Sequence, residues 1–129
     1  MTPLDLIHRY VSAMKSGDRE TGYGYFAEDI VFTVPGRSKF AGTHRGRAVA
    51  RDYIETAIAH SNEGEIELEL VDMLASDDRV AIIINERFVR AEGVVEIPRA
   101  NVYRIEDDEI VEIRIYEGNQ YGADALLSA

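Results

Sequence analysis

The sequence predicts an α+β fold in which helices cover one face of a curved, mixed or antiparallel sheet. Helical periodicity is confined to the first half of the chain, up to residue 60, and strand patterns fill the second half. Short turn signals join these strands in the manner of hairpins. This order of elements is typical of α+β proteins, and a length of 129 residues suits a single domain over residues 1–129.

The first helix is predicted over Pro3–Ser16. Thr2 supplies a hydroxyl cap, a proline follows where no N–H donor is needed, and Asp5 places a carboxylate near the positive end of the helix dipole. Apolar residues then recur at helical spacing until Gly17, which ends the pattern.

Two further helices and one strand are predicted in the first half. Asp18 is placed to cap a short helix over residues 19–26, although two glycines weaken it. Residues 29–34 are rich in β-branched and aromatic side chains, which favours a strand. Residues 35–46 carry three glycines and a proline and are expected to form a loop, and residues 47–60 have the pattern of another helix.

The second half contains four strand patterns. The first alternates apolar and polar residues, which predicts a half-buried strand, and the second has a fully apolar middle. Pro98 lies in the third and favours an edge position or a bulge there. The strands are expected at 65–74, 78–91, 94–106 and 109–117, with turns at 91–93 and 107–108 and a helical turn within 120–127.

Composition excludes several classes of partner. The chain has 24 acidic and 14 basic residues, so its net charge of −10 repels phosphate backbones and anionic membrane surfaces. We therefore expect no nucleic acid and no membrane as partner. There is no cysteine, and the first residues lack the basic and apolar regions of a signal peptide, so a cytoplasmic location is expected.

Five stretches of the chain together resemble the NTF2-like superfamily, which includes ketosteroid isomerase, limonene-type epoxide hydrolases and SnoaL-like polyketide cyclases. The stretches are RYVSAMKSGD, YFAEDIVFTVPG, AGTHRGRAVARDYI, INERFV and YRIEDDEIVEIRIYEG. The resemblance implies a cone in which three N-terminal helices pack on the concave face of the sheet. It also implies an apolar pocket between sheet and helices, and a homodimer formed through the outer sheet face.

Ketosteroid isomerase offers the first comparison of chemistry. A carboxylate base moves the proton there, while a tyrosine and a second donor hold the developing enolate oxygen. By resemblance, Tyr10 falls on the oxyanion tyrosine, and Asn101 falls on the second donor, where an amide N–H still donates. The base falls on Val34, which accepts no proton.

The epoxide hydrolase and cyclase patterns match less well. Of the hydrolase Asp-Arg-Asp set, the arginine matches Arg87, but the two aspartates fall on Val89 and Ile115. The polar pair that holds the water falls on Phe32 and Val34. SnoaL-like cyclases place an acidic residue near the end of the last strand. This chain offers Glu117 there, one residue before the usual position.

Strand alternation indicates which side chains face the pocket. If Ile113 and Ile115 face inward, Glu117 does so as well, while Glu112, Arg114 and Tyr116 lie on the outer face. The expected polar lining is Tyr10, Asn85, Arg87, Asn101, Tyr103 and Glu117, and the expected apolar lining is Phe32, Val34, Val89, Ile113 and Ile115. A mostly apolar cavity with a few polar groups suits a small molecule.

A basic loop adds one more candidate. His44 lies beside Arg37, Lys39, Arg45, Arg47 and Arg51, which would attract an anionic ligand to the pocket mouth or would be a solvated loop balanced by acidic neighbours. His8 and His60 have no partner at ligand spacing, so no metal is predicted, and no cofactor is expected.

Two functions are open at this point. The first is an isomerase, cyclase or hydrolase acting on an apolar carbonyl-containing or polycyclic substrate, with Tyr10 and Asn101 holding an oxyanion and Glu117 or His44 moving the proton. The second is a non-catalytic module that binds a hydrophobic ligand or dimerises, in which Tyr10 is a core residue and Glu117 a solvated strand end. Enzymatic activity itself is left open by the sequence.

Overall fold

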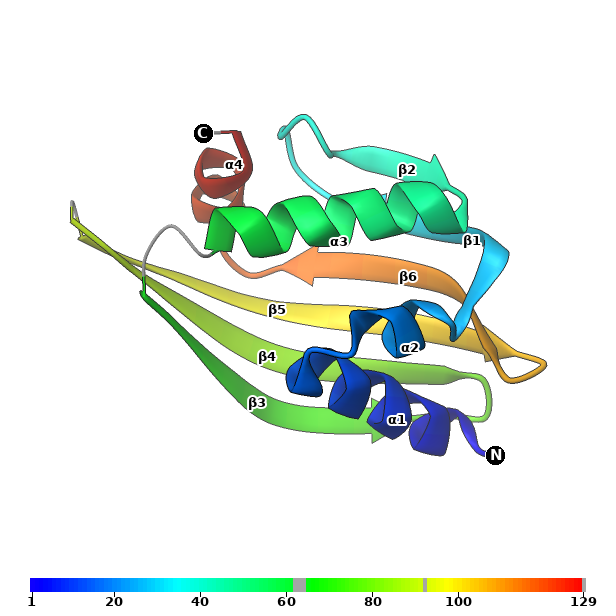
Figure 1. Ribbon diagram of the computed structural model, residues 1–129. Coiled ribbons are helices and arrows are strands. Elements are labelled where there is room, and N and C mark those ends of the chain that lie inside the picture. The colour runs from blue at the N-terminus through cyan, green and yellow to red at the C-terminus, as the bar shows by residue number, and fades with distance from the viewer. Residues whose placement is uncertain (62–64, 92, 129) are drawn as a thin grey trace.

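A computed structural model describes residues 1–61, 65–91 and 93–128 and has the α+β architecture that the sequence predicts (Figure 1). Its elements are α1 (Pro3–Ser16), α2 (Arg19–Tyr23), β1 (Phe26–Val34), β2 (Gly42–Arg45), α3 (Arg47–Ser61), β3 (Glu65–Ala75), β4 (Arg79–Arg90), β5 (Gly93–Glu106), β6 (Glu109–Glu117) and α4 (Gln120–Ser128). Among the described residues, no helix combines the length and apolar character needed to cross a membrane.

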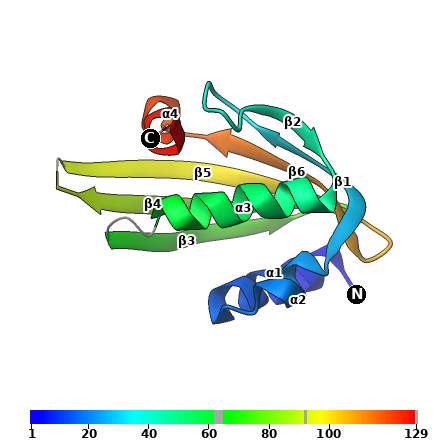
Figure 2. The ribbon, with the colours of Figure 1, turned by 45° about the horizontal axis from the view of Figure 1, so that its top comes forward.

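The strands form one mixed sheet in the order β2-β1-β6-β5-β4-β3. β1 runs parallel to β6, and every other neighbouring pair is antiparallel. Figures 1 and 2 show α1, α2 and α3 on the same face of this curved sheet. Helix α4 lies beside the end of β6 and the beginning of β5. The concave face is therefore the one that the helices enclose.

Helix α1 begins and ends where its caps predict. The Thr2 hydroxyl accepts a hydrogen bond from the Asp5 backbone N–H at 3.1 Å, and the Asp5 carboxylate accepts one from the Thr2 backbone N–H at 3.3 Å. Gly17 ends the helix with a φ of 85°, a left-handed conformation that glycine adopts without strain. Its buried face carries Tyr10 toward the sheet.

Three expectations about the fold are corrected. The expected loop over residues 35–46 contains the short strand β2, which pairs with β1 from Val31 to Val34. Helix α2 ends at Tyr23 rather than residue 26, because Phe26 already pairs with β6 as a strand residue. Pro98 lies in a central strand, not at an edge.

The place of Pro98 has a simple explanation. The last β6 residue that pairs with β5 is Glu117, opposite Arg99, and the Pro98 carbonyl accepts from the Gly118 N–H at 2.6 Å. In an extended strand the nitrogen of a residue points to the same side as its carbonyl, so the missing N–H faces the end of β6. The sheet therefore tolerates this proline in its middle.

The turns that join the last strands agree with the sequence where they are described. Asp107 and Asp108 have φ values of 51° and 59°, as a two-residue hairpin turn requires. In the other expected turn, Glu92 lies outside the described residues. Most of the buried side chains form one cluster between α1, α3 and the sheet, and Phe88, Ile97 and Ala123 form a second under α4.

Candidate functional site

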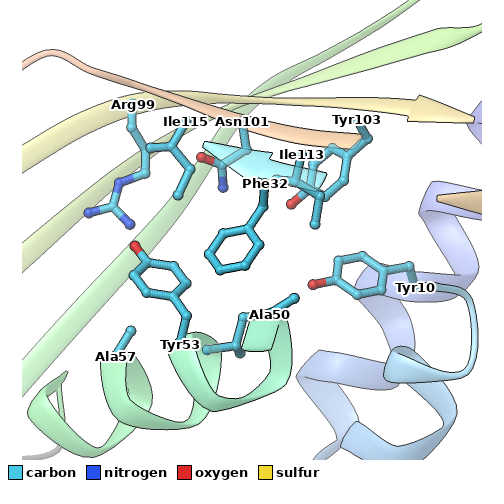
Figure 3. Close-up of a pocket in the computed structure, with 11 residues that line it drawn as sticks. Tyr10, Phe32, Ala50, Tyr53, Ala57, Arg99, Asn101, Tyr103, Ile113 and Ile115 are labelled. Carbon is cyan, nitrogen blue, oxygen red and sulfur yellow. The ribbon is translucent and has the colours of Figure 1, made fainter. Parts of the chain in front are cut away.

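A cavity of about 150 Å³ lies between α1, α3 and the concave face of the sheet (Figure 3). Most of its lining is apolar, and its polar groups come from α1, α3 and β5. The lining residues are Tyr10, Phe32, Ala50, Tyr53, Ile54, Ala57, Arg99, Asn101, Tyr103, Ile113 and Ile115. The volume is similar to that of an engineered cavity known to hold a benzene ring, so the cavity suits a small organic molecule.

Strand register determines which side chains reach the cavity. Residues that pair directly across a sheet share a face, and Asn101 is paired with Ile115 and with Ile82. Tyr103 is likewise paired with Ile113. The structure thus brings together Asn101, Tyr103 and both isoleucines, as alternation predicts.

The same register corrects the prediction for β4. Because the buried Ile82 lies on the concave face with its partner Asn101, the odd-numbered residues Asn85, Arg87 and Val89 lie on the outer face of the sheet. Arg87 forms ion pairs there with Glu67 at 3.4 Å and with a glutamate of β5 at 3.6 Å. It is a paired surface arginine and not a pocket residue.

One end of the cavity carries three neutral polar side chains, Tyr10, Asn101 and Tyr103, which we call the neutral end. Figure 3 shows the hydroxyls of Tyr10 and Tyr103 both directed into the cavity, with the Asn101 amide on the side of Tyr103, and the two rings lie 5.7 Å apart. Burial raises the pKa of Tyr10 well above its usual range, and the neighbouring Tyr103 adds to this. Burial also raises the pKa of Tyr103 to about 12, although Asn101 acts in the opposite direction. Both tyrosines are therefore neutral donors at physiological pH.

Asn101 has an unmet hydrogen-bonding capacity. Its Oδ1 atom is buried and has no hydrogen-bond partner within the described part of the chain. An unpartnered buried acceptor costs stability unless something else donates to it. At the wall of a cavity, a bound molecule can supply that donor.

The other end of the cavity, which we call the charged end, contains Arg99 and Tyr53. Arg99 is 16% exposed and forms ion pairs with Glu86 at 3.1 Å and with Glu117 at 3.3 Å. Burial raises the pKa of Tyr53 to about 12, and Arg99 acts against this rise. Sequence reasoning missed Arg99. Arg99 lies two residues before Asn101 on the same strand, so the alternation that places Asn101 inward places Arg99 inward as well.

Glu117 lies beside Arg99 and is not among the residues that line the cavity. Its side chain is 5% exposed, and its Oε2 atom is buried without a hydrogen-bond partner among the described residues. Burial raises the pKa of this carboxyl, and the contact with Arg99 limits the rise. A buried carboxyl of this kind can store and release a proton.

A family model of the SnoaL-like domain matches residues 7–113. The chain belongs to the SnoaL-like family. A comparison with curated proteins gave no match.

Solved structures show the NTF2-like fold of this SnoaL-like chain. A protein of unknown function with a cystatin-like fold from Xanthomonas campestris is 29% identical, with full coverage of both chains and a TM-score of 0.84. An NTF2-like protein from Burkholderia xenovorans is 22% identical over 98% of this chain and 95% of its own, with a TM-score of 0.72. TerC, co-crystallised with polyporic acid, is 12% identical over 98% of each chain, with a TM-score of 0.76.

Two positions at which the resemblance implies catalytic residues are apolar in this chain. Val34 is 4% exposed and packs in the core without lining the cavity, and Ile115 presents only hydrocarbon to it. Phe32 contributes the aromatic wall, with its ring 5.5 Å from that of Tyr53. The described lining thus contains no carboxylate and no imidazole.

His44 lies behind this wall, outside the set of lining residues. Its ring stacks on Phe32 at 4.8 Å, and its Nε2 is 2.6 Å from the Phe40 carbonyl. A carbonyl only accepts, so Nε2 carries a proton and donates. The structure therefore does not bring the His44 ring to the cavity.

The basic loop is also engaged in local contacts. Arg47 donates to the Phe26 carbonyl through two nitrogens, and Arg51 pairs with Glu20. Lys39 lies over the Phe40 ring at 5.3 Å. Of these three cations, Arg51 has an acidic partner, and Arg47 and Lys39 have neutral ones. Among the described residues, no group of three or more histidines and acidic residues could hold a metal ion.

Proposed function

We propose that this SnoaL-like protein is a small-molecule enzyme that acts beside a carbonyl group of a largely apolar substrate. Tyr10 and Asn101 hold the carbonyl oxygen and stabilise the negative charge that develops on it. The observation that carries this proposal is the neutral end itself, where Tyr10 and Asn101 both line one cavity. The buried, unpartnered Asn101 amide oxygen supports a bound molecule at this place.

The chemistry follows from donors that stay protonated. A tyrosine whose pKa is raised by burial donates a hydrogen bond throughout the physiological range, and an amide always does. Donors fixed in a site of low polarity stabilise a developing oxyanion more than water does, because they need no reorientation. Tyr103 beside them supports the orientation of the Tyr10 hydroxyl.

Glu117 is our candidate for the group that moves the proton. Burial raises its pKa, which favours uptake and release of a proton, and its carboxyl lies beside Arg99, which lines the cavity. His44 is the weaker of the two candidates because its ring lies behind Phe32.

The cavity volume limits the substrate. About 150 Å³ accommodates roughly one ring. We therefore propose a substrate with one ring in the cavity, and any further ring of a polycyclic compound extends beyond it. TerC, a distant fold relative, was co-crystallised with polyporic acid, which supports a ligand-binding site in this kind of fold.

A second candidate function is a non-catalytic module that binds the same kind of ligand. It is favoured by the lining itself, which offers hydrogen-bond donors but neither a carboxylate nor an imidazole among the described residues. The two candidates predict the same binding and differ in whether the bound molecule reacts.

Exchange of hydrogen for deuterium beside a carbonyl separates these candidates. Cyclohex-2-enone has one ring and a carbonyl, and its enolate carries the negative oxygen that the neutral end would stabilise. In heavy water, the enzyme should speed the incorporation of deuterium into this ketone, measured by nuclear magnetic resonance. Replacement Tyr10→Phe removes one donor to the oxyanion and should slow the exchange by about 100-fold.

Tyr121→Phe is the matched control, because Tyr121 is 91% exposed on α4 and should leave the rate unchanged. Exchange at the rate of buffer alone, together with measurable binding of the ketone, would identify the non-catalytic module. Absence of binding would reject both candidates.

A further inference from the structure

We infer that the substrate also carries an acidic group, such as a carboxylate, which binds to Arg99 and Tyr53 at the charged end of the cavity while Glu117 takes up a proton. This inference rests on the proposed function and names the class of its substrate. It concerns the charged end of the cavity, where Glu117, the candidate for moving the proton, contacts Arg99.

Arg99 is suited to hold an anion. Among the described residues that line the cavity it is the one charged side chain, and it is largely withdrawn from water. A guanidinium has five N–H donors, and its contacts with Glu86 and Glu117 use one nitrogen each, Nη1 and Nε. Donors therefore remain for a group within the cavity, and charge-assisted hydrogen bonds of this kind are among the strongest in proteins.

Tyr53 adds a second donor at the same place. Figure 3 shows its hydroxyl directed toward the Arg99 guanidinium, on the opposite side of Phe32 from Tyr10. With a pKa of about 12, this hydroxyl stays protonated and can donate to an anion. A carboxylate oxygen at this point would accept from both side chains.

Charge balance explains why Glu117 takes up a proton when an anion binds beside Arg99. Glu117 is faced by Arg99 from β5, Glu86 from β4, Tyr53 from α3 and Asp124 from α4. With both glutamates ionised, one guanidinium faces two carboxylates, and a third anion there would be repelled. Protonation of Glu117 offsets the negative charge that the ligand brings, so that Arg99 again faces two carboxylates, and burial already favours the neutral form of Glu117.

The test compares benzoate with benzamide, which share one ring and differ in charge. Calorimetric titration from pH 6 to pH 9 should show benzoate binding about tenfold more tightly than benzamide at pH 6. The advantage should fall as pH rises, and titrations in two buffers of different ionisation enthalpy should show net proton uptake with benzoate alone. The variant Glu117→Gln should bind benzoate with no proton uptake and little dependence on pH.

Arg99→Gln should lose the preference for benzoate and keep the binding of benzamide. Arg104→Gln is its matched control, because Arg104 is on the same strand, faces outward and also pairs with two glutamates. If Arg99→Gln fails to fold because two carboxylates lose their partner, the double variant Arg99→Gln/Glu117→Gln makes the same comparison.

Equal binding of the two compounds, or benzoate binding without proton uptake, would overturn the inference. That outcome leaves the proposed function standing, provided that the neutral ketone still exchanges deuterium in a Tyr10-dependent manner. Failure of both compounds and of the ketone to bind would overturn the two proposals together.

Discussion

Filling the cavity from helix α3 should stabilise the protein and abolish ligand binding. Ala50 is 1% exposed and lines the cavity. Ala50→Leu adds three carbon atoms, which at about 0.8 kcal/mol each contribute about 2.4 kcal/mol of burial. Ordering the leucine side chain costs about 0.5–1 kcal/mol, so the net gain is about 1.5 kcal/mol. For a chain of this size, that corresponds to a rise of about 6 °C in the melting temperature.

Urea unfolding and thermal melting measure the stability, and a melting series with cyclohex-2-enone measures binding. Ala59→Leu makes the same change on an exposed position of α3, so its stability should change by less than about 0.5 kcal/mol and its binding should persist. If Ala50→Leu were destabilised by more than about 1 kcal/mol through overpacking, or still bound the ketone, the cavity would not be the open space described above.

Three further predictions concern pH, a turn and assembly. Burial raises the pKa of Glu117 from 4.5, so its contribution to stability is present below pH 4.5 and is lost as pH rises through the folded-state pKa. Glu117→Gln should reduce the dependence of the unfolding free energy on pH in this range. Parallel curves for the wild type and the variant would show that Glu117 is not the titrating group. Asp108→Gly should raise the unfolding free energy by about 1 kcal/mol in urea, because residue 108 has a φ of 59°, and no gain would argue against strain there. Light scattering should find a homodimer that Tyr116→Glu converts to monomer, since Tyr116 lies 53% exposed on the outer sheet face, and a wild-type monomer at micromolar concentration would reject it.

The sequence was most informative where the signals were local. Thr2, Asp5 and Gly17 determine the two ends of α1 through contacts within a few residues, and the helix has the predicted bounds. The turn at Asp107–Asp108 was likewise predictable, because side chains that tolerate positive φ stand between two strand patterns. Strand β2 was missed because its four residues follow a glycine-rich segment and form a strand only by pairing with β1.

Side-chain direction was less predictable, because alternation says which residues share a face but not which face is inside. The sequence pattern predicts Asn85 and Arg87 on the inner face, whereas the pairing of Ile82 with Asn101 shows that they lie on the outer face. Arg99 was missed because a charged strand residue is usually exposed, and its burial depends on glutamates that two other strands supply. Such arrangements depend on register across the sheet, which a single sequence does not reveal.

A crystal structure of the protein soaked with cyclohex-2-enone tests the central claim most directly. We expect the ring between Phe32 and Ile113 and the ketone oxygen within about 2.7–3.1 Å of the Tyr10 hydroxyl and the Asn101 amide nitrogen. A ketone bound with its oxygen toward Arg99, or a cavity that stays empty at saturating ketone, would contradict the account.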